Sequence, residues 1–255
     1  MTESSELEQL RTEHTPEAVS ARLRAGPKQS YLRDFVYGAI DGTVTTFAVV
    51  AGVAGAELSD QVIIILGLAN LIADGFSMAS SNWSALRAEE QLRQKARAQE
   101  EMHVERHPEG EREEIRQIFA EKGFQGEDLE RVVEVITANR ERWVNVMLQE
   151  ELGLTLKGPS AIWAALTTFV AFIVIGSIPL LTFLLRAINP DLVTAPFLWS
   201  CILTGLTFFG VGVGKSYFVK QRWYWSGLET LFVGGLAASL AYGIGALLKG
   251  VVGVS

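Results

Sequence analysis

Two carboxylates lie inside stretches that are otherwise apolar enough to cross a membrane. Asp41 lies near the start of one stretch, and Asp74 lies in the middle of the next. An ionised side chain at the bilayer centre costs about 2.5–3.5 kcal/mol on insertion scales, so such residues usually face a cavity and mark an ion or proton path. For Asp41, the alternative is a structural hydrogen bond or a hydrated position near the interface.

The second of these stretches carries three donors at helical spacing. Asn70, Asp74 and Met78 follow one another at intervals of four residues, which puts an amide, a carboxylate and a thioether on one stripe. This stripe could guide a metal ion that has lost its water. Ordinary packing is the alternative for Met78.

Further donors lie in residues 87–157, which hold seventeen of the 29 acidic residues. Three pairs have members three or four residues apart, so both members project from one helix face. They are Glu100 with His103, Glu111 with Glu114, and Met147 with Glu151. If the helices converge, these ligands favour a transition metal over Ca²⁺ or Mg²⁺. The alternatives are a solvated acidic face and a place for Met147 in the hydrophobic core.

Five apolar segments are long enough to position the intramembrane donors, since about 20 helical residues span a hydrocarbon core roughly 30 Å thick. They are residues 35–57, 61–86, 158–185, 192–214 and 226–248. The expected fold class is an all-α membrane protein with five transmembrane helices. Pro179 in "GSIPLL" is expected to break or kink the third.

Residues 87–157 predict a three-helix insert between the second and third spans. No Gly or Pro interrupts "ALRAEEQLRQKARAQEEMHVERH", so the second span should continue as one helix to about residue 106. A second helix should begin at Pro108 and end near Lys122. A third should begin near Glu127 and carry apolar residues at helical spacing to about residue 151.

The distribution of charge predicts the orientation and excludes some partners. Lys and Arg gather on one side of a five-span arrangement, which places the N-terminus and residues 87–157 in the cytoplasm. The net charge of −7 argues against nucleic acid and is compatible with cations. Residues 1–28 lack the apolar core of a secretory signal. The one cysteine, Cys201, allows no thiolate cluster.

Several motifs, in order, resemble the vacuolar iron transporter (VIT) family. They are "YGAIDGTVTTFAVVAGVAGA", "GLANLIADGFSMASSNW", "HPEGEREEI", "WVNVMLQEELGL", "GSIPLL" and "GLETLFVGGLAA". The likeness extends from residue 31 to residue 250. It implies a five-span homodimer that takes Fe²⁺, and often Mn²⁺, from the cytoplasm in exchange for protons.

The resemblance also implies roles for particular residues. Asp41 and Met78 match an Asp and a Met that line the family's path at the dimer interface. The positions matching the family's metal-binding domain are Glu100, His103, Glu111, Glu114, Met147, Leu148 and Glu151.

The chain departs from the family pattern at three of its positions. His103, Leu148 and Asn70 stand where the family has carboxylates. His103 remains a competent ligand, and the neighbouring Glu150 could compensate for Leu148 if the helix turns slightly. Asn70 removes a titratable group from the expected path, which weakens the case for proton coupling more than the case for metal movement.

The sequence therefore predicts a metal transporter rather than an enzyme. Its cargo would be Fe²⁺, with Mn²⁺, Zn²⁺ and other divalent transition metals as alternatives, carried out of the cytoplasm by proton antiport. The expected domains are a polar arm (1–30), two spans (31–86), a cytoplasmic metal-binding domain (87–157) and three spans (158–255). The absence of a recognisable eukaryotic sorting signal favours a bacterial inner membrane over a vacuole-like membrane.

Two rival functions remain open at this point. The Glu100-x-x-His103 spacing echoes di-iron bundles, so the insert could be a membrane-anchored ferroxidase, although the second His-bearing motif of such sites is missing. The other rival is an iron-binding or storage module that its spans merely anchor. Asp41 and Asp74 argue against that rival, because an anchor has no use for intramembrane carboxylates.

Overall fold

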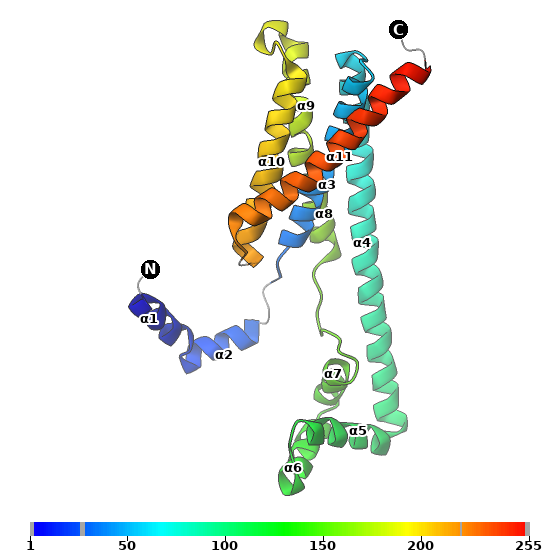
Figure 1. Cartoon of the computed structure of the whole chain (residues 1–255). Coiled ribbons are helices and arrows are strands. Elements are labelled where there is room, and N and C mark those ends of the chain that lie inside the picture. Colours follow the sequence, from blue (N-terminus) through cyan, green and yellow to red (C-terminus); the bar gives the residue numbers. More distant parts are fainter. Residues whose placement is uncertain (1–2, 26–28, 220, 253–255) are drawn as a thin grey trace.

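The computed structural model describes residues 3–25, 29–219 and 221–252, and every regular element in these ranges is helical (Figure 1). The elements are α1 (Glu3–Glu13), α2 (Pro16–Ala25), α3 (Leu32–Gly55), α4 (Asp60–Arg106), α5 (Pro108–Glu121), α6 (Gly126–Thr137), α7 (Arg140–Glu150), α8 (Ala161–Gly176), α9 (Ile178–Ile188), the 3-10 turn η1 (Pro190–Leu192), α10 (Pro196–Val219) and α11 (Trp223–Val252). The predicted all-α class is confirmed. Of the polar arm 1–30, residues 1–2 and 26–28 lie outside the described ranges.

Within the described ranges, four helices are long and apolar enough to cross a membrane: α3, α4, α10 and α11. Helices α8 and α9 pass the same test together but are bent by 50°. The bend falls at Ser177, and Pro179 lies in the first turn of α9. Proline interrupts a helix because it lacks the N–H donor and its ring clashes with the preceding turn. The break at Pro179 is confirmed. The number of five spans stays a prediction, because it requires that the bent pair α8 and α9 forms one span.

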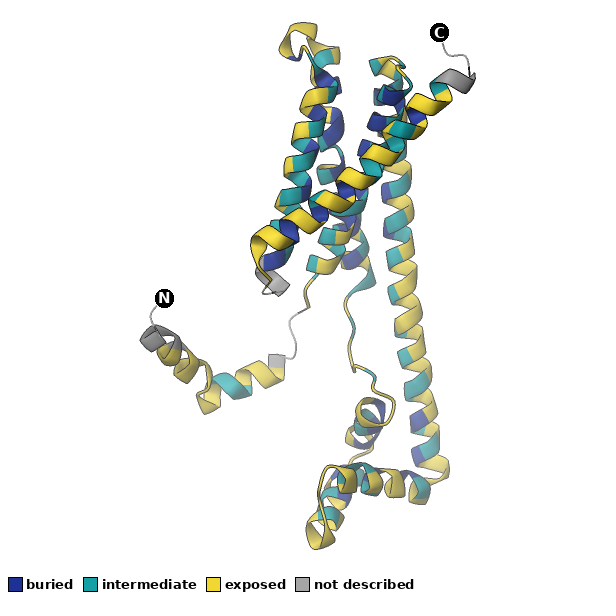
Figure 2. Cartoon of the chain, viewed as in Figure 1, coloured by how far each residue is buried: buried dark blue, intermediate teal, exposed yellow. Residues whose placement is uncertain are grey.

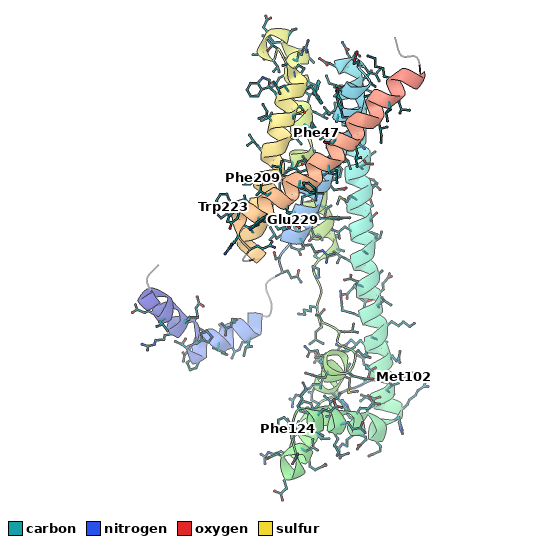
Figure 3. All side chains as sticks on the ribbon, viewed as in Figure 1. Phe47, Met102, Phe124, Phe209, Trp223 and Glu229 are labelled. Atoms are coloured by element: carbon teal, nitrogen blue, oxygen red, sulfur yellow. The ribbon has the colours of Figure 1, made fainter. Side chains whose placement is uncertain are left out.

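Helix α3 contacts α4, α8, α10 and α11. A glycine lets its backbone approach α8 closely, since a Cβ on Gly42 would lie 2.7 Å from the carbonyl oxygen of Phe172. Phe47, labelled in Figure 3, joins Ile63 and Leu180 in a hydrophobic cluster shared by α3, α4 and α9. Small residues commonly hold membrane helices together by such close approach, because lipid supplies no hydrophobic drive between them.

Helix α4 is a single helix of 47 residues that runs out of the bundle (Figure 1). No residue of this helix is buried between Ala79 and Glu100, and most of this stretch is exposed in Figure 2. We call residues 80–99 the stem. The predicted continuous helix to residue 106 is therefore present.

Beyond the stem, the insert contains one helix more than predicted. Helix α5 begins at Pro108, as expected, but the single helix expected from Glu127 to about residue 151 is divided into α6 and α7. The break occurs because Asn139 caps α7, where its Oδ1 accepts a hydrogen bond of 2.9 Å from the backbone N–H of Arg142. The three-helix description of the insert is wrong in this respect.

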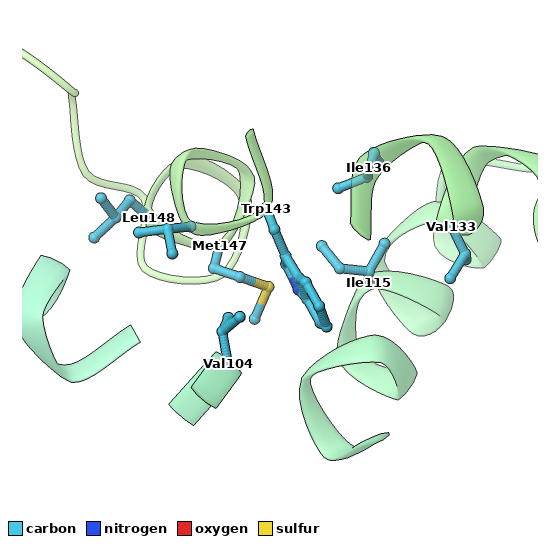
Figure 4. Close-up of a cluster of buried hydrophobic side chains, with 8 residues drawn as sticks. Val104, Ile115, Val133, Ile136, Trp143, Met147 and Leu148 are labelled. Atoms are coloured by element: carbon cyan, nitrogen blue, oxygen red, sulfur yellow. The ribbon is translucent and has the colours of Figure 1, made fainter. Parts of the chain in front are cut away.

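The insert has a hydrophobic core of its own (Figure 4). Eight buried side chains from four helices form it: Val104, Ile115, Val133, Ile136, Trp143, Val144, Met147 and Leu148. The core brings together the end of α4 and helices α5, α6 and α7, although these segments are short. This packing positions the polar residues that lie one turn away on the same helices.

Candidate metal centre and intramembrane polar residues

Three helices of the insert direct carboxylates to one place because each carboxylate lies one turn from a core residue. Glu100 precedes Val104 on α4, Glu111 precedes Ile115 on α5, and Glu151 follows Met147 at the end of α7. Residues four apart share a helix face. The faces that build the core therefore also bring the carboxylates together.

The centre of the cluster consists of Glu100, His103 and Glu111, each of which offers a ligand atom within 4.8 Å of the others. Glu100 is 3% exposed and Glu111 is 5% exposed. His103 Nδ1 lies 3.3 Å from Oε1 of Glu111. In each buried carboxylate, Oε2 has no hydrogen-bond partner among the described residues. Buried carboxylate oxygens normally have partners, so this arrangement is suited to a cation.

Electrostatic coupling extends the cluster to two more acidic residues. Burial, followed by the carboxylates of Glu114 and Glu100, raises the pKa of Glu111 to about 7. Burial is also the main cause of the raised pKa values of Glu100 and Glu151, and His103 opposes both shifts. A divalent cation would replace protons in this cluster, so metal binding would release protons and weaken as the pH falls.

The remaining residues predicted for the insert site have other surroundings. Met147 is fully buried and lies beside Val104 and Trp143 in the core (Figure 4). Leu148 belongs to the same core. Glu150 is exposed and forms an ion pair with Lys122, so this conformation does not bring it to the cluster in place of Leu148.

In the membrane part, the predicted path residues lie on facing helices. Asn70 Nδ2 donates a hydrogen bond to Oδ2 of Asp74, and Asp41 on α3 is close enough to Asp74 on α4 to interact with it electrostatically. The Asp41 carboxylate makes no hydrogen bond or ion pair with a described residue, which leaves the structural alternative for this residue without support. Met78 lies one turn beyond Asp74 and is half-buried.

One polar contact in the membrane part was not anticipated from the sequence. Asn82 Nδ2 donates to Oδ1 of Asp34 at 2.8 Å and to Oγ1 of Thr168 at 2.9 Å, and so ties together α4, α3 and α8. We call these three residues the polar tie. The sequence contains a pattern that could have indicated this contact. Asn82 continues the spacing of four from Met78, and Asp34 lies two turns before Asp41.

The fold and the cluster together define a helical membrane protein with a carboxylate and imidazole site on an insert. The model of the VIT family matches residues 32–246, and the chain belongs to this family. The expected resemblance is thereby confirmed.

Curated relatives cover most of the chain. A "Vacuolar iron transporter" of Toxoplasma gondii is 36% identical over 231 residues, which are 88% of this chain and 76% of the relative. "Vacuolar iron transporter 1" of Arabidopsis thaliana is 30% identical over 212 residues, 83% of each chain. A "Vacuolar iron transporter" of Plasmodium falciparum is 30% identical over 225 residues, 86% of this chain and 82% of the relative. These relatives are named as transporters, in agreement with the prediction that the chain is not an enzyme.

Proposed function

We propose that the protein carries Fe²⁺ across its membrane and out of the cytoplasm. The observation that carries the proposal is the Asp41 carboxylate in the membrane part, which has no bonding partner among the described residues and interacts electrostatically with Asp74 on the neighbouring helix α4. An ionisable group at that depth is costly unless an ion compensates it. The names of the relatives support iron as the cargo.

The insert would collect the ion before it enters the membrane. Glu100, His103 and Glu111 offer carboxylate oxygens and an imidazole nitrogen, a ligand set that suits Fe²⁺ and also Mn²⁺ or Zn²⁺. Glu114 and Glu151 would add negative charge around it, and Met147 lies in the core one turn from Glu151. These assignments are part of the proposal.

The path itself would pass Met78, Asp74 and Asp41 at the interface between two copies of the chain. All three side chains are half-buried in one protomer, which leaves part of each accessible to a partner. Asp41 would hold the metal when ionised and a proton when neutral, and alternation between the two states would give antiport. Asn70, bonded to Asp74, would orient that carboxylate instead of titrating.

We also propose an orientation for the insert and a host membrane for the protein. The insert would lie in the cytoplasm because basic residues gather at its end of the spans. The expectation of a bacterial inner membrane draws no support from relatives named as vacuolar, and it stays a prediction.

The test is Fe²⁺ and Mn²⁺ flux into proteoliposomes, with the internal pH recorded in parallel. The natural protein should move both metal and protons, and Asp41→Ala should abolish the flux. Asp191→Asn, in the exposed turn η1, is the matched control and should transport normally. No flux from the natural protein would contradict the proposal. Oxygen consumption on addition of Fe²⁺ would then favour the ferroxidase.

A further inference from the structure

Two cavities meet on the side of α4 that faces α8. One, of about 460 Å³, is apolar and is lined by Phe76 on α4 and by Leu166 and Phe169 on α8. The other, of about 490 Å³, lies where α8 begins and is lined by Arg87 and Ser160. Trp83 lines both, so the two cavities adjoin each other, and we call them together the groove, with an apolar and a polar end.

The groove crosses the level at which α4 leaves the membrane. No charged residue occurs between Asp74 and Arg87, and Trp83 lies one turn before Arg87 on the same face of the helix. Trp is enriched where hydrocarbon meets headgroups, and basic residues just beyond that level attract anionic lipids. The apolar end of the groove therefore lies at acyl-chain depth and the polar end at headgroup depth.

Two charged residues line the polar end, Arg87 and Glu90, and Arg93 is bonded to Glu90, so these three groups sum to one positive charge. Oε2 of Glu90 already accepts hydrogen bonds from Arg93 at 2.7 and 3.0 Å. Arg87 is exposed and makes no hydrogen bond or ion pair with a described residue. Its guanidinium is thus available to an anion, and guanidinium groups bind phosphate well.

We propose that this groove binds one anionic phospholipid from the leaflet on the insert side. The phosphate lies at Arg87, and one acyl chain lies between α4 and α8 against Phe76 and Phe169. Trp83 is nine residues after Asp74, which places it on the opposite side of the helix at about 100° per residue. The lipid site is therefore separate from the carboxylates of the membrane path.

The proposal is tested by native mass spectrometry of the purified full-length protein, free of metal, with phosphatidylglycerol and phosphatidylcholine as probes. One phosphatidylglycerol should be retained about fivefold more strongly than phosphatidylcholine, the effect of one basic residue near an anionic surface. Arg87→Gln should remove this preference. Lys95→Gln removes the same charge from α4 but does not line the groove, and it should keep the preference.

A second pair of variants tests the acyl-chain end. Leu166→Trp places a larger side chain in the groove from an exposed position and should lower the retention of both lipids. Leu181→Trp, on the exposed face of α9, should not. Equal retention of the two lipids by the natural protein, or equal losses in the members of either pair, would overturn the proposal. Because no metal is present, neither outcome bears on transport.

Discussion

Glu111 combines deep burial with an unpartnered oxygen, and this combination makes the metal-free insert sensitive to pH. Its pKa is about 7 in the folded protein, against 4.5 as the ordinary value. Between these values the folded state binds more protons than the unfolded state, so stability falls as the pH rises. The difference is on the order of 3 kcal/mol for this one group.

The metal-free protein should therefore have a more stable insert at pH 5 than at pH 7.5. Hydrogen exchange over residues 100–151, corrected for the intrinsic rate at each pH, measures this. Glu111→Gln should flatten the dependence without abolishing it, since Glu100 and Glu151 also have raised pKa values. An unchanged pH profile in the variant would contradict the assignment.

Asn82 is the second residue whose individual role can be tested, because its amide satisfies two groups on two other helices. Asn82→Leu leaves Asp34 and Thr168 without this donor and should destabilise the bundle by about 1–3 kcal/mol. Thermal unfolding in detergent checks the change. Ser81→Ala, at the exposed neighbouring position, should leave the midpoint unchanged. Equal midpoints for both variants would show that the polar tie is not structural.

At the scale of elements, the boundary between α6 and α7 depends on a single cap. Asn139→Ala removes the acceptor for the backbone N–H of Arg142 and should cost about 1 kcal/mol. Hydrogen exchange should become faster in the first turn of α7. Gln149→Ala, exposed near the other end of the helix, serves as the comparison. Similar exchange in both variants would mean that core packing alone sets the boundary.

Sequence patterns predicted the elements that depend on local composition. The apolar segments, the continuous α4 and the break at Pro179 each follow from residues that are neighbours in the chain. The division at Asn139 was missed because apolar spacing continues across it from α6 into α7. Local capping overrides that periodicity.

The candidate metal site was partly predictable because the two residues of each pair are close together in the chain. The spacing within each pair put Glu100 with His103 and Glu111 with Glu114, and the core then brought the two helices together. The ion pair of Glu150 with Lys122 and the polar tie join residues 28 to 86 positions apart. Contacts over such distances depend on tertiary packing, which a single sequence does not reveal.

On the scale of the whole molecule, the stem is the part of α4 that connects its membrane-spanning part to the insert. Leu92→Pro should kink it at an exposed position, while both hydrophobic cores keep their contacts. If the insert supplies ions to the membrane path, flux should fall at low Fe²⁺ concentration and recover at saturation. Leu92→Ala should behave as the natural protein does. A uniform loss at every concentration would instead indicate damage to the path.

The length of the stem also decides how far the charge of the insert can act. Met78 and Glu100 are 22 residues apart on one helix, a separation of about 33 Å at 1.5 Å per residue. The Debye length in physiological salt is about 8 Å, so the field of the acidic cluster is largely screened at Met78. Raising the ionic strength above physiological salt should therefore alter how ions accumulate on the insert while leaving the potential at Met78 almost unchanged.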